Sequence, residues 1–235
     1  MRYLGGKHRQ SKEIARHIAE VSDGDYWEPF MGGGSVAAAV ARTQSFDTMH
    51  LSDAHTDLVL MWQALLDGWL PPERVSLEEW QALKGALPSA ERGFVGFACS
   101  FAGKWFSSYA VDSRPSEDAA GAGARGLAKK VAALLEVGTV SVTHQSYDAV
   151  APVSGDVLYL DPPYANTAGY STGSFDSAAF WSWAQRHAEG GVHVFVSEFT
   201  APDGWVPVWS VERTAIIRPH NRKKAVEHLY SWEGS

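Results

Sequence analysis

Three consecutive glycines, residues 32–34, constrain the fold of this chain more than any other feature. They follow residues 26–30, which have the composition of a short strand, and they precede an alanine-rich helical stretch that runs to about Arg42. Ser35 is of the residue type that caps a helix N-terminus. The order of strand, glycine turn and helix predicts the opening of a nucleotide-binding βαβ unit, because glycine lets a ligand approach the backbone at a helix N-terminus.

The remaining periodicity predicts an α/β sheet that is interrupted by a helical region. Further strands are expected near 48–52, 140–142, 156–161 and 192–196, and helices near 10–20, 58–66 and 176–189. Two extended stretches, near 211–218 and 226–232, predict a hairpin around a basic turn. No strand alternation is clear from about 67 to 138, where the alanine and glycine run 119–124 predicts a mobile loop.

Composition narrows the class of protein. The chain has 235 residues, of which 45% are hydrophobic and 12% aromatic, enough for one large domain or one domain with an insertion. The formal net charge of −7 argues against coating polyanions through global charge. Two stretches are nevertheless basic, 1–20 and 218–224, although ordinary solvated surface explains either stretch taken alone.

Membrane, disulfide and metal sites are not expected. No apolar run is long enough to span a bilayer and no signal-peptide core is present, so we expect a cytoplasmic protein. The single cysteine, Cys99, excludes an internal disulfide, and its apolar flanks predict a core position. Among the nine histidines no spacing typical of zinc ligands occurs.

The motif Asp161-Pro162-Pro163-Tyr164 follows the apolar run 157–160. Two prolines with fixed φ and no N–H stop a strand abruptly, which leaves Asp161 at its carboxyl end. Ligands bind at this edge of open α/β sheets. A carboxylate, a stiff turn and an aromatic face suit a planar group such as a nucleobase amine, and the alternative is an ordinary strand-terminating turn.

Asp53 follows the second expected strand and lies 19 residues beyond Gly34. An acid about 20 residues beyond the glycine turn commonly accepts hydrogen bonds from ribose hydroxyls in such folds. The alternative role is a helix cap. The glycine triplet matches neither the spaced glycines of dinucleotide enzymes nor a phosphate loop with Gly-Lys-Ser/Thr.

Adenine is a suitable partner for the proline motif. Its N6 lone pair is delocalised into the ring, so methylation at N6 needs acceptors that hold both N–H groups. The Asp161 carboxylate and the Pro162 carbonyl can be these acceptors. Tyr164 can stack on the ring, a contact worth roughly 1–3 kcal/mol. A base in a duplex must first be extruded, at a cost of a few kcal/mol.

Over nearly its whole length the chain resembles the Dam-like DNA adenine-N6 methyltransferases that use S-adenosyl-L-methionine (AdoMet), in particular small phage-type members. The resemblance is carried by residues 3–7, 28–35, 103–106 and 161–164, with Asp161 lying 127 positions beyond Gly34. It implies a Rossmann-like class I methyltransferase sheet with a C-terminal antiparallel hairpin. The catalytic domain would comprise residues 1–66 and 139–235, and a mainly helical target-recognition insertion would comprise 67–138.

The resemblance also implies roles for individual residues. The catalytic set would be Asp161, Pro162, Pro163 and Tyr164. The AdoMet-binding set would be Tyr3, Lys7, Glu28, Pro29, Phe30, Gly32, Gly34, Ser35, Asp53, Ser146, Tyr147 and Asp161. The DNA-binding set would be Arg9, Lys104, Asn221, Arg222, Lys223 and Lys224. The chain departs from the family where an acid often precedes an aromatic, so the acceptor for the cofactor's adenine amine is Ser146, Asp148 or neither.

We therefore expect a site-specific enzyme that methylates N6 of a flipped-out adenine in double-stranded DNA, without metal, membrane or obligate protein partner. Protection in restriction-modification, host mimicry and regulation would all use this chemistry, in a bacterial or phage-infected cell. Two alternatives stay open: methylation of RNA or of a protein amide, and a catalytically inactive DNA-binding homologue. The insertion argues against the first. Intact Asp161 and Tyr164 argue against an inactive homologue. That alternative stays open because Ser146 stands where the family often has an acid.

Overall fold

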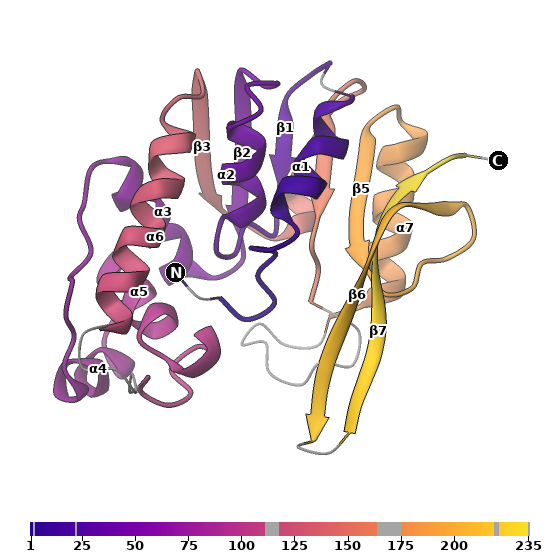
Figure 1. Ribbon diagram of the computed structural model, residues 1–235. Coiled ribbons are helices and arrows are strands. Elements are labelled where there is room, and N and C mark those ends of the chain that lie inside the picture. Colours follow the sequence, from indigo (N-terminus) through magenta and orange to yellow (C-terminus); the bar gives the residue numbers. More distant parts are fainter. Residues whose placement is uncertain (2, 22, 111–117, 164–174, 219–220, 235) are drawn as a thin grey trace.

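A computed structural model describes residues 1, 3–21, 23–110, 118–163, 175–218 and 221–234, and its centre is a seven-stranded sheet (Figure 1). The strands are β1 (Tyr26–Glu28), β2 (Thr48–Asp53), β3 (Thr139–His144), β4 (Val157–Leu160), β5 (His193–Glu198), β6 (Trp205–Arg218) and β7 (Asn221–Trp232). Their order is β3-β2-β1-β4-β5-β7-β6. Strands β1 to β5 are parallel, and β7 runs antiparallel to both β5 and β6. The predicted α/β class with a C-terminal antiparallel hairpin is confirmed.

The helices cover both faces of this sheet. They are α1 (Ser11–Ala19), α2 (Ser35–Ala41), α3 (Thr56–Leu66), α4 (Leu77–Lys84), α5 (Ala90–Ala98), α6 (Ala119–Leu134) and α7 (Ser177–Glu189), with two short 3-10 turns, η1 (Phe101–Gly103) and η2 (Tyr147–Ala149). Helices α1, α2 and α6 pack side by side on one face, and α7 covers β5 from the other (Figure 1). None of the described helices is both long and apolar enough to cross a membrane.

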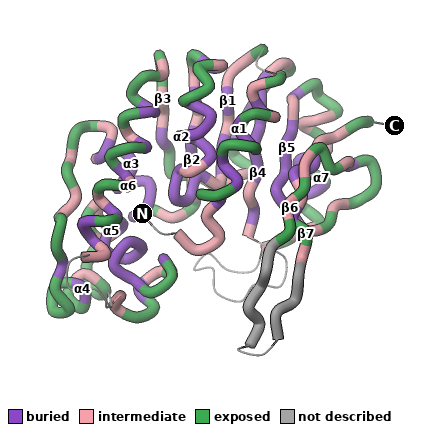
Figure 2. The backbone as a smooth tube through the Cα atoms, in the orientation of Figure 1, coloured by how far each residue is buried: buried purple, intermediate pink, exposed green. Residues whose placement is uncertain are grey.

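Strand β4 lies in the middle of the sheet and is buried on both faces (Figure 2). Val157 and Tyr159 belong to the core under α1, α2 and α6, whereas Leu158 and Leu160 belong to the core under α7. A parallel strand that is covered on both faces has a continuous apolar sequence, which is the pattern of 157–160. The expected strand is therefore confirmed, and Asp161 directly follows its last residue.

The turn between β1 and α2 depends on Gly34, which is the N-cap of α2 and has a positive φ of 61°. A Cβ at this position would lie 2.5 Å from the Trp62 ring, so both the backbone angle and the packing require glycine. The predicted cap at Ser35 is wrong, because Ser35 is the first helical residue and makes no capping hydrogen bond.

The alanine and glycine run 119–124 forms the first turns of α6, so the predicted loop is wrong. Asp118 caps this helix by accepting a hydrogen bond of 2.8 Å from the Ala120 amide. Alanine favours helix, and the small residues bring α6 close to α5. A Cβ on Gly123 would stand 3.0 Å from Ala98, which shows how tightly the two helices pack.

The C-terminal hairpin is longer than predicted. Arg218 at the end of β6 pairs with Asn221 at the start of β7, so residues 221–224 have strand backbone instead of forming a turn. The expected basic turn is therefore mostly strand. Residues 219–220 and the side chains of 213–224 lie outside the described part of the chain.

Candidate functional site

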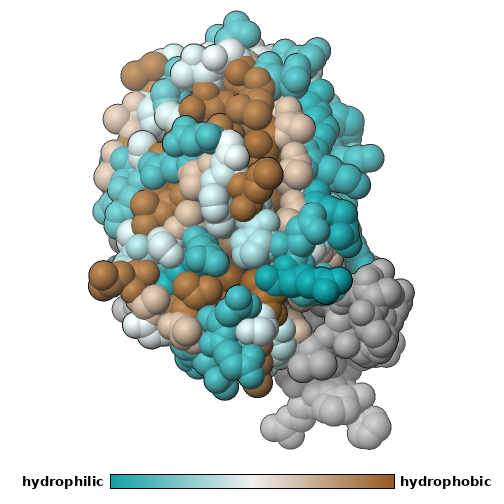
Figure 3. Space-filling view, turned by 90° about the vertical axis from the view of Figure 1, so that its left-hand side faces the viewer, coloured by the Kyte–Doolittle hydropathy of each residue, from teal (hydrophilic) through white to brown (hydrophobic). Residues whose placement is uncertain are grey.

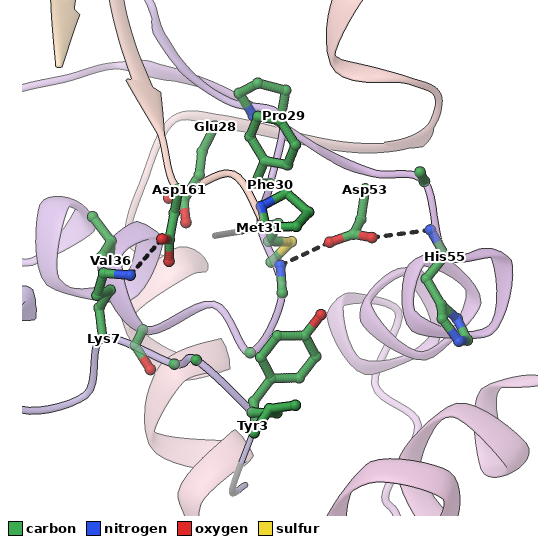
Figure 4. Close-up of a pocket in the computed structure, with 18 of the residues that line it drawn as sticks. Tyr3, Lys7, Glu28, Pro29, Phe30, Met31, Val36, Asp53, His55 and Asp161 are labelled. Carbon is green, nitrogen blue, oxygen red and sulfur yellow. Dashed lines mark hydrogen bonds and ion pairs between the residues drawn. The ribbon is translucent and has the colours of Figure 1, made fainter. Parts of the chain in front are cut away.

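A cavity of about 390 Å³ opens at the carboxyl ends of β1, β2 and β4 (Figure 4). Every residue of the predicted AdoMet-binding set lines it except Gly34, namely Tyr3, Lys7, Glu28, Pro29, Phe30, Gly32, Ser35, Asp53, Ser146, Tyr147 and Asp161. Sequence motifs that are far apart in the chain thus line one cavity. The cavity lies at the carboxyl edge of the sheet, where ligands bind in open α/β folds.

The glycine turn packs directly against Tyr3 (Figure 4). A Cβ on Gly32 would lie 2.8 Å from the Tyr3 ring, and a Cβ on Gly33 would lie 2.9 Å from the Tyr3 Cβ. The other side of Tyr3 contacts Phe97, with 5.0 Å between the ring centroids. The absence of side chains at the turn therefore lets the N-terminal motif close one wall of the cavity. Gly33 was not in the predicted set, although the same triplet contains it.

Asp53 joins the end of β2 to the glycine turn. Its Oδ2 accepts a hydrogen bond of 2.9 Å from the Gly32 amide, and its Oδ1 accepts one of 2.9 Å from the His55 amide (Figure 4). His55 occupies the N-cap position of α3, so Asp53 is not the cap of that helix. Burial raises the pKa of Asp53, and the backbone hydrogen bonds oppose this shift. Each carboxylate oxygen has two acceptor positions, so both can accept a further hydrogen bond.

Two buried ionisable groups lie beneath the turn. The Tyr26 hydroxyl donates a hydrogen bond of 2.7 Å to Glu28, and burial raises the pKa of Glu28 to about 8. The Lys130 ammonium donates to the Gly33 carbonyl and, at 3.0 Å, to the Ser35 hydroxyl, while burial lowers the pKa of Lys130 to about 8. Lys130 comes from α6, and sequence reasoning missed it because no motif precedes or follows it.

Asp161 forms an ion pair with Lys7 (Figure 4). The Lys7 Nζ also lies 3.1 Å from the Glu227 Oε1 of β7. The side chains of Lys7 and Glu227 are almost fully buried, with 2% and 3% exposed, whereas 20% of Asp161 is exposed. Lys7 was predicted at the cofactor, and the structure brings it to the catalytic candidate Asp161 as well. Glu227 was not predicted.

The rest of the proline motif is only partly described. Pro162 is buried and Pro163 lines the cavity, whereas Tyr164 lies outside the described residues. On the other wall, Phe30 stacks on Tyr147 with 5.4 Å between ring centroids and an angle of 24°. This pair presents a flat apolar surface.

Ser146 and Asp148 were the two candidate acceptors for the cofactor's adenine amine. Ser146 lines the cavity beside the Phe30–Tyr147 pair, and Asp148 is exposed and does not line it. The geometry favours Ser146 over Asp148.

The predicted DNA-binding residues lie in separate places. Lys104 is exposed at the rim of the cavity, where the Leu4 amide donates to the Gly103 carbonyl at 3.2 Å. Arg9 is exposed outside the cavity lining. Asn221, Arg222, Lys223 and Lys224 begin β7, and their side chains are outside the described part.

The side of the molecule that carries α4, α5 and α6 presents apolar side chains among hydrophilic ones (Figure 3). Leu70, Leu87 and Phe101 are each more than two thirds exposed. Within the described ranges, no three His, Cys, Asp or Glu side chains gather in a way that would hold a metal ion.

Several solved structures match most of the chain at low identity and with TM-scores below 0.5. The rRNA methyltransferase aviRa from Streptomyces viridochromogenes matches with a TM-score of 0.46 and 15% identity, covering 97% of this chain and 86% of that one. An rRNA methylase from Streptococcus thermophilus gives 0.40 and 10%, covering 94% and 96%. A SAM-dependent methyltransferase from Leishmania major gives 0.41 and 10%, covering 95% and 72%. Comparison with curated protein sequences gave no match.

Residues 3–90 match the family described as D12 class N6 adenine-specific DNA methyltransferase. The matched part includes Tyr3, Lys7, the glycine turn and Asp53, which form one half of the cavity wall. The resemblance read from the motifs is therefore supported by a match of residues 3–90 to the D12 class N6 adenine-specific DNA methyltransferase family.

Proposed function

We propose that this enzyme transfers the methyl group of AdoMet to N6 of an adenine that has been rotated out of double-stranded DNA. The observation that carries this proposal is that a single cavity joins Asp161 to the glycine turn and Asp53. Asp161 supplies an acceptor for an amine. The glycine turn and Asp53 supply polar groups suited to a nucleoside. The family match over residues 3–90 supports adenine in DNA as the substrate.

The residues around the cavity fit AdoMet. Asp53 keeps acceptor positions for ribose hydroxyls, and Phe30 with Tyr147 offers a flat apolar surface for the adenine ring. Ser146 is placed to accept from the adenine amine, and Tyr3 closes the cavity beside the turn. When bound, AdoMet supplies an electrophilic methyl group on a positively charged sulfur. The protein's part is to hold this group in line with the amine.

Asp161 and the Pro162 carbonyl hold the two N–H groups of the target amine and so concentrate electron density at N6. After transfer N6 must release one proton, and the Asp161 oxygen that holds this N–H can pass it to water. Tyr164 stacks on the base, a contact worth roughly 1–3 kcal/mol that offsets the cost of extrusion. The role of Tyr164 follows from its position in the motif Asp161-Pro162-Pro163-Tyr164.

Residues 67–138 form the target-recognition region on the catalytic domain of residues 1–66 and 139–235. Exposed Lys104 at the cavity rim supports this assignment, because a cation there lies beside the opening through which a base would enter. Helix α6 connects the recognition region to the catalytic domain, because it packs on α2 and its Lys130 contacts the glycine turn. Arg9 and the basic residues 222–224 add phosphate contacts.

The test is transfer of tritium from labelled AdoMet to unmethylated double-stranded DNA, followed by nucleoside analysis. We expect the label in N6-methyladenine, and we expect Asp161→Ala to abolish it. Asp203→Asn, which removes a charge from an exposed loop, is the matched control and retains activity.

Other results would overturn the proposal. Label in N4-methylcytosine, or undiminished activity of Asp161→Ala, contradicts the assigned chemistry. Preferential labelling of RNA or protein in a competition assay would favour the alternative acceptors. Absence of AdoMet binding in calorimetry would favour an inactive DNA-binding homologue.

A further inference from the structure

The Lys7 ammonium lies between two carboxylates that are far from Lys7 and from each other in the sequence. It forms an ion pair with Asp161 after β4, and its Nζ lies 3.1 Å from the Glu227 Oε1 in β7. Lys7 and Glu227 are buried side chains with 2% and 3% exposed. Figure 4 shows the ammonium directed at the carboxylate that faces the cavity.

This contact occupies an atom that the proposed chemistry needs. Asp161 Oδ1 accepts from Lys7, whereas a methyl acceptor amine must donate to the same carboxylate. Because a carboxylate has several acceptor positions, the amine and the ammonium can both contact Asp161, but they then share its negative charge. A buried ammonium that loses its partner is strongly destabilised, because the protein interior solvates charge poorly.

We propose that Glu227 is a positioning residue that draws the Lys7 ammonium toward itself and so leaves more of the Asp161 charge for the target amine. This inference rests on the proposed function. Glu227 is close enough to keep Lys7 paired after a small rotation of the lysine side chain. Lys7 thus pairs with Asp161 before the base arrives and leans toward Glu227 when the amine binds.

The position of Glu227 in the hairpin connects the Lys7 contacts to the strand that carries the DNA-binding candidates. Glu227 lies in the same strand as the basic residues 222–224, three positions beyond Lys224. Strand β7 is paired on both sides, with β5 and β6, so its backbone is held within the sheet. The strand that carries the DNA-binding candidates therefore also carries the second partner of Lys7.

The first test is Glu227→Gln, which keeps the shape of the side chain and removes its charge. Lys7 is then left with Asp161 as its carboxylate partner and binds it more tightly. We expect kcat divided by the KM for unmethylated plasmid DNA to fall 10- to 100-fold, the effect of one hydrogen bond to a charged group. The Kd for AdoMet stays within twofold. Glu233→Gln, an exposed acid just beyond β7, is the matched control.

A double-mutant cycle with Lys7→Met separates this role from a structural one. Once the ammonium is removed, Glu227 has nothing to retain, so Glu227→Gln changes single-turnover methylation by less than twofold in that background. A purely structural role would give the same loss in both backgrounds, and this result would overturn the inference. If Glu227→Gln lowers the Tm strongly, Glu227→Asp, which keeps the charge but shortens the reach, is measured in its place.

The wild-type enzyme distinguishes the two proposals. If it does not label adenine, the proposed function is wrong. If it labels adenine and the Glu227 variants retain the wild-type kcat and KM, the proposed function stands and the role of Glu227 is refuted.

Discussion

The indole Nε1 of Trp62 donates a hydrogen bond of 3.0 Å to the carbonyl oxygen of Gly32, and the same ring occupies the place where a Cβ on Gly34 would stand. One buried side chain of α3 thus fixes both ends of the glycine turn. The turn cannot accept a side chain at Gly34 unless Trp62 moves, and moving Trp62 breaks the bond to Gly32.

Gly34→Ala is therefore expected to damage the turn. The φ of 61° and the 2.5 Å approach to Trp62 together cost about 2–4 kcal/mol of stability. We expect a lower Tm and an AdoMet affinity at least tenfold weaker by calorimetry. Gly85→Ala is the control, since its φ is negative and its Cβ would meet no atom within 4 Å. Equal affinities in the two variants would contradict this account.

Lys130→Met is expected to weaken AdoMet binding while sparing DNA binding. The substitution keeps the apolar stem but leaves the Gly33 carbonyl and the Ser35 hydroxyl without their charged donor. A lost hydrogen bond to a charged group costs about 1.5–3 kcal/mol, which corresponds to a roughly 10- to 100-fold rise in Kd. The neighbouring exposed Lys129→Met is the matched control. Parallel loss of AdoMet and DNA affinity would indicate general unfolding instead.

Glu28→Gln is expected to change how stability depends on pH. Folded Glu28 keeps its proton up to about pH 8, whereas an ordinary glutamate releases it near 4.5. Glu28 therefore takes up a proton on folding in this window, and its contribution to the free energy of unfolding falls as pH rises from about 4.5 to 8, by at most about 1.4 kcal/mol per pH unit. The Met1 amino group, whose pKa burial lowers to about 5, acts in the opposite direction between about pH 5 and 8, so only the difference between variant and wild type isolates Glu28. Lys130, with its pKa lowered to about 8, contributes only above this window.

Urea unfolding between pH 5 and 8 measures this effect. The free energy of unfolding of Glu28→Gln should rise relative to that of the wild type as pH goes from 5 to 8, and Glu136→Gln, at an exposed position, should follow the wild type. A wild-type curve that matches the Glu28→Gln curve across the window would refute the buried protonated state of Glu28.

The basic residues at the start of β7 are expected to contact phosphates. Replacing Lys223 and Lys224 by glutamine should weaken DNA binding similarly for different sequences and reduce the slope of log K against log salt by about 1 for each lysine. Arg186→Gln, an exposed charge on α7, should leave the slope unchanged. Fluorescence anisotropy across a salt series provides the measurement, and an unchanged slope in the lysine variants would place DNA elsewhere.

Local sequence patterns predicted those parts of the site whose structure is determined by neighbouring residues in the sequence. The glycine turn is visible because the backbone itself needs glycine at residue 34, and Asp161 is visible because prolines end a strand. The order of these motifs was sufficient to predict the cavity edge and the family. These features depend on neighbours within a few residues, which a sequence displays directly.

The missed features depend on contacts between distant residues. Lys130 lies 97 residues from Gly33, and Glu227 lies in a strand whose alternation says nothing about its partner Lys7. Run 119–124 looked like a loop because its glycines are poor helix formers, yet their small size lets α6 approach α5. Packing against a distant element decided each of these cases, and no pattern within the segment encodes it.

The Lys7 contacts also join parts of the chain that are made at different times during synthesis. Asp161 lies 154 residues after Lys7 in the sequence, and Glu227, in β7, lies later still. Contacts between such distant residues form late in folding, because closing a long loop is entropically costly. A nascent chain that stops before β7 holds the glycine turn and Asp161 but lacks the second partner of Lys7. We therefore expect full activity only in a chain that has been synthesised through β7.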